Sequence, residues 1–505
     1  MLSRRAFCTK ASVFGLGWSV TDISHILSQL SINSEFQYLP LVTDGSPASK
    51  IPVPEGHRIA FGYDYFTLDT SEKGLLLNCP QIPDKFKGKI FLRLQSAIDT
   101  RTQDDVDVLL GDTGKKIGSF SIWYPTNLQI FETALNADAA SLRKHGIRLV
   151  FKNGNRPLYF FSTRADNGSH LFLTQTATIN ESEWLNLLYS PRSLQPFDWL
   201  EGCVLDGLQE LYIRKHDQKA LAAIQQHLDY YLVDDKNLVY IDLWAKPKDN
   251  TLTNLEAGIP FAVIGQHRKQ HPAVTLFLDF CKKRYDANGV LTADYLSTEG
   301  CYTLAYPLTI LAKQLNAPEL YELALKEIEA RISFLTEDGV IYRAGSRKNG
   351  KTSENRNWSR GYVWFLLGLV RTAEELNKSP LQNDPRVKRL KEVYLHFAHV
   401  ALRHQQKDHS WNSYIDLSET KYESSATAGF GAALAHGHRI GWLPEFGKDR
   451  LQKIYSRLQK SLTPDGFLKD ITQHNAGNME MIQKGNYRVI SQYALGFLAH
   501  IKAHL

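Results

Sequence analysis

The sequence contains few cysteines for its length. Five are scattered over 505 residues, with no CxxC pair and no Cys/His spacing typical of a zinc site. An odd, dispersed set argues against a disulfide framework and against structural zinc. Cys203, Cys281 and Cys301 lie within apolar runs, where a free cysteine packs as a small core residue. His436 and His438 fall near a predicted helix C-terminus, which favours histidine without any metal. We therefore predict no metal site.

Long hydrophobic runs and dense basic blocks are also missing. No segment approaches the roughly 20 apolar residues that a transmembrane helix needs. The net charge of +6 is spread over 59 basic and 53 acidic side chains. Without a basic block and interleaved aromatic residues, nucleic acid is a poor partner. A mild basic excess suits an acidic small substrate. No feature indicates an oligomeric state.

The N-terminus carries an arginine pair. In the segment SRRAFCTK the pair is followed by Phe7 and Lys10, and a short, mild apolar stretch comes next. This order is typical of a twin-arginine export signal, and the alternative is a merely basic start of a cytosolic protein. We predict a bacterial signal segment over residues 1–30, export to the periplasm, and a linker over 31–55.

The residues from 56 to 180 have a β-rich pattern. Short runs such as KIFLRLQSA, GIRLVFKNG and PLYFFST are separated by Gly, Asn and Asp. This spacing predicts an antiparallel β-sandwich. Such an accessory domain either braces its neighbour or binds sugar, and we favour bracing.

The residues from 181 to 505 have a helical pattern. Paired apolar stretches recur with a period of roughly 45–65 residues, which indicates helical hairpins. The stretches are 202–215, 218–232, 255–268, 272–285, 299–315, 319–335, 359–377, 385–404, 424–440, 447–462 and 487–504. With one more helix near 182–190 they make six hairpins, which predict a mainly α fold, an (α/α)6 toroid. An open α-solenoid is the structural alternative.

Polar motifs recur where predicted inner helices begin. TLTNLEAGIPFAVIG places Asn254 and Glu256 before one helix, and STEGCYTLAYP places Glu299 at the start of another. Each acid alone is explained as a capping or first-turn residue that faces the helix dipole. In a closed ring, however, the inner N-termini surround one cavity. The repetition therefore favours a shared active site.

Two further helix entrances carry aromatic and polar residues, in RNWSRGYVWFLLGLV and KYESSATAGFGAALAHG. Arg360 beside Trp358 also fits a structural cation–π pair. The complete set of candidate substrate-binding residues is Trp358, Arg360, Trp364, Tyr362, Arg343, Asn254, Tyr302, Glu423 and Ser424.

The helical part, about 195–505, resembles the unsaturated glucuronyl and rhamnogalacturonyl hydrolases of glycoside hydrolase families 88 and 105. NLEAGIPF is similar to their N-x-D-x-G-F segment, and TEGCYTLAYP to their D-G-x-[YF]-M segment. NWSRGYVWFLLGLV is similar to W-x-R-G-N-G-W, and YESSATAGFGAALAHG to E-T-S-x-[ST]-A-x-F-x-x-A-L. The order and spacing of these segments agree, whereas the β region lies outside the resemblance.

The resemblance implies a glycoside hydrolase that removes a terminal glucuronyl or galacturonyl residue, 4,5-unsaturated in the relatives, from an acidic oligosaccharide. It implies general acid/base catalysis by carboxylates and no cofactor. Glu299 falls at the family's acid/base aspartate, and Glu256 at the second pocket aspartate. Both positions hold glutamate here. Arg343 replaces an expected histidine, which adds a permanent charge suited to a carboxylated sugar, and Tyr362-Val363 replaces Asn-Gly.

Three other functions remain open. Two glutamates across a sugar also equip a saturated, β-glucuronidase-type exo-hydrolase. A polysaccharide lyase on an α/α toroid would use a tyrosine or histidine base, such as Tyr302, beside Arg360. A non-catalytic glycan-binding protein on a degenerate scaffold would retain aromatics and lose its acids. The presence of both Glu256 and Glu299 argues against this last function.

Overall fold

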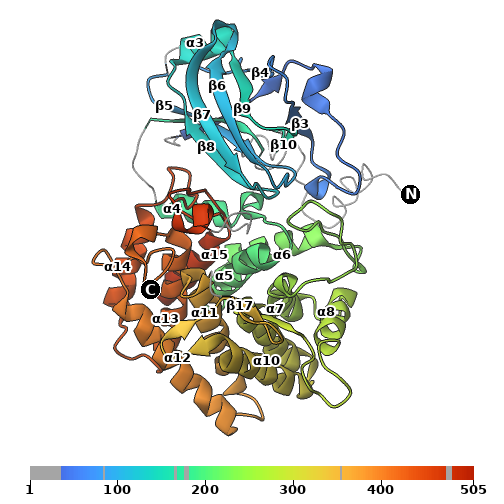
Figure 1. The fold of residues 1–505 in the computed structure, drawn as a ribbon, viewed down its shortest axis with the longest axis vertical. Coiled ribbons are helices and arrows are strands. Elements are labelled where there is room, and N and C mark those ends of the chain that lie inside the picture. The colour runs from blue at the N-terminus through green and yellow to red at the C-terminus, as the bar shows by residue number, and fades with distance from the viewer. Residues whose placement is uncertain (1–35, 84–85, 164–167, 176–180, 353–354, 474–479) are drawn as a thin grey trace.

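The computed structural model describes residues 36–83, 86–163, 168–175, 181–352, 355–473 and 480–505. A β-domain lies above a larger helical domain (Figure 1). The predicted export signal, residues 1–30, lies outside the described residues. Within these ranges, every helix is too short or too polar to cross a lipid bilayer.

Two antiparallel sheets form the β-domain. One has the order β1 (Phe36–Pro40), β11 (His170–Thr174), β5 (Lys89–Gln95) and β8 (Ile130–Ala134). The other has the order β2 (Val42–Thr43), β4 (Leu75–Asn78), β9 (Ile147–Asn153), β6 (Gln103–Leu110) and β7 (Lys115–Trp123). The pair β3 (Tyr65–Leu68) and β10 (Leu158–Phe161) and helix α3 (Ala139–His145) complete the domain. One apolar core fills the space between the sheets, so the predicted sandwich is confirmed.

The pattern of β6 shows why this region forms a sandwich. Val106 and Val108 are fully buried, while Asp105 and Asp107 alternate with them and are partly exposed. This period of two places apolar side chains on one face of the sheet. In the antiparallel register, Val108 lies opposite Leu149 of β9.

The boundary predicted for the β-domain was too late. Residues 36–43 were assigned to a linker, but they form β1 and β2, which pair with β11 and β4. Both are edge strands, and only Leu39 among their residues is buried. Short edge strands carry little of the alternating pattern that marks a central strand, which explains the error.

Six inner helices close into a ring, which confirms the toroid and excludes the open solenoid. They are α5 (Trp199–Lys215), α7 (Pro260–His267), α9 (Tyr306–Leu315), α11 (Ser359–Leu376), α13 (Ser424–Arg439) and α15 (Ala494–His504). Each packs on the next, and α15 packs on α5. The outer helices are α6 (Gln218–Tyr231), α8 (Pro272–Lys282), α10 (Glu319–Leu335), α12 (Pro385–Arg403), α14 (Lys448–Gln459) and α4 (Glu181–Leu188).

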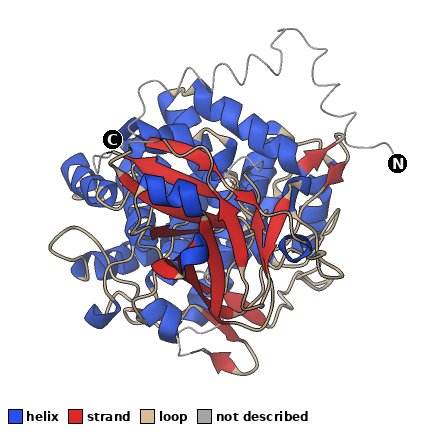
Figure 2. Ribbon diagram, turned by 90° about the horizontal axis from the view of Figure 1, so that it is seen from above, coloured by secondary structure: helices blue, strands red, loops and turns tan. Residues whose placement is uncertain are grey.

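Inner and outer helices differ in how they are buried. Almost every residue of α11 is buried, as expected for a helix with neighbours all round. Helix α14 instead buries Leu451, Ile454, Tyr455 and Leu458, one stripe of a 3.6-residue period. Seen from above, the strands lie across one end of the ring (Figure 2).

Short strands lie in the connections between helices. They are β12 (Leu232–Val233), β13 (Asn237–Leu238), β14 (Tyr295–Ser297), β15 (Thr336–Glu337), β16 (Val340–Ile341), β17 (Ala344–Ser346) and β18 (Gly350–Lys351). Strands β14, β17 and β18 form one small antiparallel sheet. This sheet matters for the site because β14 leads into α9 and β17 follows Arg343.

A buried charge pair joins the two domains. Arg93 of β5 binds both carboxylate oxygens of Asp465, with 2.8 Å between Nη2 and Oδ1. The hydroxyl of Tyr38 donates to the same carboxylate at 2.6 Å. Burial opposes ionisation of Asp465, but Arg93, Arg192 and the hydroxyl of Tyr38 together outweigh it and hold the pKa of that carboxyl well below its usual range. This buried ion pair therefore fixes the position of the β-domain on the toroid.

Candidate active site

Glu299 lies where a strand turns into an inner helix. Strand β14 ends at Ser297, and the helix begins at Glu299 and continues through a π-helical turn, Cys301–Ala305, into α9. Such turns are rare and often lie at functional sites. Only 5% of the Glu299 surface is exposed.

Gly300 follows this acid because no side chain fits there. A Cβ at this position would collide with the guanidinium of Arg331 from α10. Arg331 is fully buried, forms an ion pair with Glu327, and donates from Nε to the carbonyl oxygen of Ser297 at 2.8 Å. Because Gly300 has no side chain, Arg331 of α10 can reach the end of β14, and this contact positions Glu299.

Glu256 is positioned by a second close approach of two backbones. It lies in the short 3-10 turn Leu255–Gly258 before α7, and Asn254 caps this turn by accepting from the amide of Ala257 at 3.1 Å. A Cβ on Gly258 would collide with the carbonyl oxygen of Thr303 in the π-helical turn. The two acid-bearing turns are thus in contact.

Arg343 connects Glu299 to a third hairpin. Its Nε donates to Oε1 of Glu299 at 2.9 Å, and its carbonyl oxygen accepts from the amide of Thr298 at 2.8 Å. The guanidinium lies 5.3 Å from the ring centroid of Trp358, the N-cap residue of α11. The structure therefore brings together four predicted residues, Glu256, Glu299, Arg343 and Trp358, from three inner-helix entrances.

The surroundings shift the pKa values of the two carboxyls in opposite directions. Burial raises the pKa of Glu256, and the neighbouring charge of Glu299 adds to this, giving a pKa of about 6. Burial also disfavours the charged form of Glu299, but the charge and hydrogen bond of Arg343, together with hydrogen bonds from the Glu299 amide and Ser297, outweigh it and lower the pKa of Glu299 below its ordinary value. Two carboxyls whose pKa values are pushed apart by their surroundings are characteristic of acid/base pairs.

Two residues near this pair, Tyr295 and Arg101, were missed from the sequence. Tyr295 of β14 is 52% exposed, and the charges of Glu299 and Arg343 act on its pKa. The charge of Arg101, from the β5–β6 loop, offsets a small part of the rise in the pKa of Glu256, and its guanidinium lies over the ring of Trp244. The position of Tyr295, four residues before Glu299, could have indicated it. Arg101 could not be found this way because another domain supplies it.

The comparison with protein families decides the identity. The profile of the family described as Glycosyl Hydrolase Family 88 matches residues 176–504. The chain belongs to glycoside hydrolase family 88. No curated protein matches the chain.

Solved structures agree with this fold. A possible family 105 member from Salmonella enterica serovar Paratyphi A shares 17% identity at a TM-score of 0.52, covering 61% of this chain and 82% of that chain. A possible family 105 member from Klebsiella pneumoniae shares 14% sequence identity at a TM-score of 0.53, and the match covers 65% of this chain and 94% of that chain. The family 105 glycoside hydrolase of C. acetobutylicum shares 17% sequence identity at a TM-score of 0.53, and the match covers 65% of this chain and 99% of that chain. At these identities the likeness shows the fold alone.

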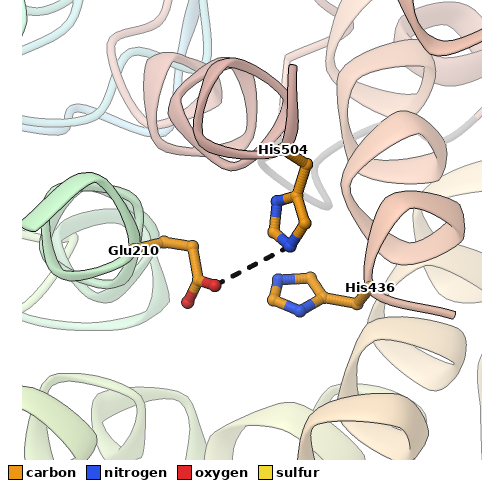
Figure 3. A group of neighbouring side chains, drawn as sticks. All are labelled: Glu210, His436 and His504. Atoms are coloured by element: carbon orange, nitrogen blue, oxygen red, sulfur yellow. Dashed lines mark ion pairs between the residues drawn. The ribbon is translucent and has the colours of Figure 1, made fainter. Parts of the chain in front are cut away.

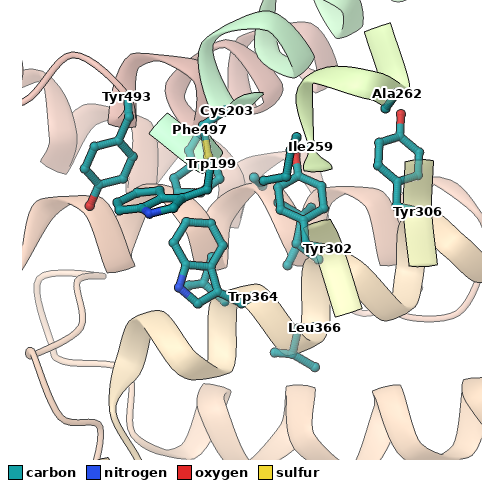
Figure 4. Packing of buried hydrophobic residues seen from close by; sticks show 14 of the residues in the cluster. Trp199, Cys203, Ile259, Ala262, Tyr302, Tyr306, Trp364, Leu366, Tyr493 and Phe497 are labelled. Atoms are coloured by element: carbon teal, nitrogen blue, oxygen red, sulfur yellow. The ribbon is translucent and has the colours of Figure 1, made fainter. Parts of the chain in front are cut away.

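Two aromatic residues predicted to contact substrate lie in the core of this family 88 toroid (Figure 4). Tyr302 is fully buried and donates its hydroxyl to Asp206. Trp364 is 2% exposed and packs edge-on against Trp199, with ring centroids 5.2 Å apart. Both side chains belong to the apolar core inside the ring of helices and are not part of the site formed by Glu256 and Glu299.

Arg360 and Tyr362 also have structural partners. Arg360 is 2% exposed and lies 4.7 Å from the ring centroid of Trp358, as the cation–π interpretation expects. Its Nη1 donates to the carbonyl oxygen of Thr472 at 2.9 Å and the hydroxyl of Tyr493 at 3.0 Å. The buried hydroxyl of Tyr362 donates to the carbonyl oxygen of Gly339 at 2.9 Å. These contacts fasten α11 to neighbouring segments.

Glu423 and Ser424 tie α13 to the chain before α15. Glu423 caps α13 by accepting from the amide of Ala426, and it also accepts from the amide of Thr472 at 3.0 Å. Ser424 donates to the carbonyl oxygen of Lys469. Both side chains are fully buried, so Glu423 acts as a helix cap and not as a substrate contact. Asn254, also predicted to bind substrate, is an exposed helix cap.

At the opposite end of the ring, Glu210, His436 and His504 point toward one another (Figure 3), with possible ligand atoms within 4.8 Å. Two histidines and a carboxylate are a known metal-binding set. Here, however, Arg214 donates to Oε1 of Glu210 at 2.8 Å, and Arg371 donates to Oε2 at 2.6 Å. These guanidinium charges oppose a bound cation, so the cluster fits a buried ionic network better than a metal centre.

Proposed function

We propose that this family 88 hydrolase removes a terminal 4,5-unsaturated glucuronyl or galacturonyl residue from an acidic oligosaccharide. The observation that carries the proposal is the pair Glu256 and Glu299, whose pKa values are displaced in opposite directions. With a pKa of about 6, Glu256 can hold a proton near neutral pH. Glu299, beside Arg343, stays ionised. One group can therefore give a proton while the other takes one.

The reaction begins with hydration of the double bond. Glu256 donates its proton to C4, and positive charge develops at C5 and the ring oxygen. A water molecule adds its oxygen to C5 and gives a proton to Glu299. The resulting hemiketal opens to a ketone and releases the second sugar from C1. The proton returns from Glu299 to Glu256 through water, so the net reaction consumes one water molecule.

These roles reverse those that the family resemblance implies, which make Glu299 the acid/base. The reason is electrostatic. A proton on Glu299 would break its charge-assisted hydrogen bond to Arg343, which is among the stronger polar interactions in proteins. Glu256 has no comparable stabilisation. Burial and the nearby negative charge of Glu299 raise its pKa, so Glu256 is the carboxyl that still carries a proton to donate.

Positive charge at the site supports an acidic substrate. Arg343 is 23% exposed through its side chain, and Arg101 of the β-domain is 37% exposed. Guanidinium groups match the planar geometry of a carboxylate. A uronate entering between them would meet both charges, whereas a neutral sugar would gain nothing from them.

The test offers two substrates in parallel. One is a lyase-generated oligosaccharide with an unsaturated terminal uronate, followed by loss of the ultraviolet absorbance of its double bond. The other is a saturated aryl β-glucuronide. Consumption of the first alone supports the proposal. Turnover of the second alone replaces it with ordinary exo-hydrolysis, and turnover of neither contradicts catalysis on uronides.

The roles of the two acids are tested in the same assay. Glu256→Gln and Glu299→Gln should each lower kcat by about 100-fold or more, the usual size of a lost acid or base. Glu392→Gln, a change at an exposed position of the outer helix α12, is the matched control and should leave the rate unchanged. Full activity in either active-site variant would remove that residue from the mechanism.

A further inference from the structure

A loop of the toroid is held by the β-domain from two sides. Arg58 donates to both carboxylate oxygens of Asp249, at 2.6 and 2.7 Å, and to the carbonyl oxygen of Tyr240 at 2.9 Å. On the other side, Nδ2 of Asn127 donates to the carbonyl oxygen of Asp242 at 2.9 Å. The position of this loop, residues 240–249, is therefore set by the docking of the β-domain.

Trp244 lies in this loop with an unusually accessible ring. Its surface is 46% exposed, although tryptophan is highly buried on average. The Cζ of Arg101 lies 4.8 Å from the ring centroid. One domain thus supplies the aromatic ring and the other supplies the cation. An exposed aromatic ring offers an apolar surface against which a sugar ring can pack.

Arg101 is held in place at a conformational cost. Its φ is +52°, a left-handed backbone conformation that is uncommon for residues other than glycine. Asp99 stabilises it: Oδ1 accepts from the Arg101 amide at 2.7 Å, and Oδ2 pairs with Nε at 2.9 Å. Asp99 is only 5% exposed. Strain that is fixed by a buried carboxylate suggests that the position of the guanidinium has a function.

We propose that Arg101 and Trp244 form a second sugar subsite beside Glu256, which binds a negatively charged sugar unit of the oligosaccharide. The sugar ring packs on Trp244, and its carboxylate or sulfate binds the guanidinium of Arg101, whose planar fork matches both anions. Arg101 is near enough to Glu256 for its charge to act on that carboxyl. The subsite therefore adjoins the reacting end of the substrate.

This inference rests on the proposed function and deepens it, because it assigns selection of the second sugar to the β-domain. A toroid without the β-domain would lack Arg101, as well as the contacts of Arg58 and Asn127 that fix Trp244. The β-domain then does more than brace its neighbour. It completes the substrate site.

The experiment measures equilibrium binding by isothermal titration calorimetry, so that it does not depend on turnover. It uses the Glu299→Gln variant and three unsaturated disaccharides, whose second sugar is neutral, carboxylated or sulfated. Arg101→Gln should weaken binding of one or both charged disaccharides by about tenfold, the value of a hydrogen bond to a charged group. Binding of the neutral disaccharide should stay unchanged. Trp244→Ala should weaken all three.

The matched control is Arg268→Gln. Arg268 is also a partly exposed, ion-paired arginine, but it lies at the far end of α7 from Glu256. This change should affect none of the three affinities, and Arg101→Lys should retain part of the preference for charge. The thermal unfolding midpoint of each variant shows that the fold is intact.

Equal weakening of charged and neutral disaccharides by Arg101→Gln would overturn the charge-recognition role. Unchanged binding in both the Arg101 and Trp244 variants, or no binding of any disaccharide before these changes, would overturn the subsite. If the unaltered protein binds charged disaccharides with the expected dependence on Arg101 but does not hydrolyse them, the proposed function fails and the subsite stands.

Discussion

Arg343 donates from Nε to Oε1 of Glu299 over 2.9 Å, and the charge of Glu299 acts in turn on Glu256 at the neighbouring helix entrance. Two neighbouring carboxyls, one buried and one half-buried, would otherwise compete for a proton, and neither would have a defined role. The arginine resolves this competition because it stabilises one ionised carboxylate. That carboxylate then raises the pKa of the other acid. One ion pair thus gives the two glutamates different protonation states.

The first prediction concerns the pH dependence of kcat/KM on an unsaturated substrate. Because Glu256 must carry a proton, kcat/KM should fall about tenfold for each pH unit above its pKa of about 6. The acidic limb should reflect protonation of Glu299, at a pH below the usual glutamate pKa. A rate that instead rises as the pH passes through 6 would show that Glu256 acts as a base.

The second prediction is that Arg343→Gln moves the acidic limb. Without the guanidinium, burial is opposed only by the hydrogen bonds of Glu299 to its own amide and to Ser297, so the pKa of Glu299 should rise. The acidic limb of the kcat/KM profile should shift to higher pH, and activity near neutral pH should fall. Arg343→Lys retains the charge without the planar fork and should shift the limb less. An unmoved limb in Arg343→Gln would contradict this account of the ion pair.

Much of the fold follows from local patterns that the sequence carries. The helix pairs were predictable because each apolar stretch is long and continuous, and their number, six hairpins, predicts a closed ring. The sequence offers no local reason for Gly258 and Gly300. Their reason, close contact with Thr303 and Arg331, depends on segments that pack against them from elsewhere in the chain.

The candidate site was only partly predictable for a related reason. Position at a helix entrance does not say whether a side chain turns toward the opening or into the ring. Glu299 and Glu423 both stand at such entrances, yet Glu299 meets Arg343 while Glu423 caps its own helix. Arg101 depends on the docking of two domains, which no local pattern encodes.

The third prediction concerns the domain interface. Arg93→Met leaves Asp465 buried with less counter-charge and should lower the free energy of unfolding by about 3 kcal/mol. Arg192, 3.3 Å from Asp465, limits the loss. Lys116→Met is the control, because Lys116 belongs to a half-exposed ion pair and should cost less than about 1 kcal/mol. Urea unfolding measures both.

The same interface allows a second comparison. The double variant Arg93→Met, Asp465→Leu removes the buried carboxylate together with its partner and should recover part of the stability lost in Arg93→Met. If the double variant is less stable than Arg93→Met, the buried charge of Asp465 is not the source of the loss.

The fourth prediction concerns acid stability and the histidines at the far end of the ring. Burial lowers the pKa of His504 to about 4, against the opposing charge of Glu210. The unfolded chain, with an ordinary histidine pKa near 6.5, therefore binds a proton that the folded protein excludes. This group costs no stability above about pH 7, and its cost grows as the pH falls from 6.5 toward 4.

At pH 5.5 this linkage amounts to about 1.4 kcal/mol, because one pH unit below the unfolded pKa corresponds to about that energy. Glu256 and Asp99, with pKa values of about 6 and about 7, also titrate between pH 7.5 and pH 5.5. The contribution of His504 is therefore read from the difference between the unaltered protein and a His504 variant, each unfolded in urea at both pH values. His436, whose pKa burial also lowers, contributes in the same direction. His504→Gln cannot take up a proton and should lose less stability between the two pH values. An equal loss in both proteins would mean that His504 is as easily protonated in the folded ring as in the unfolded chain.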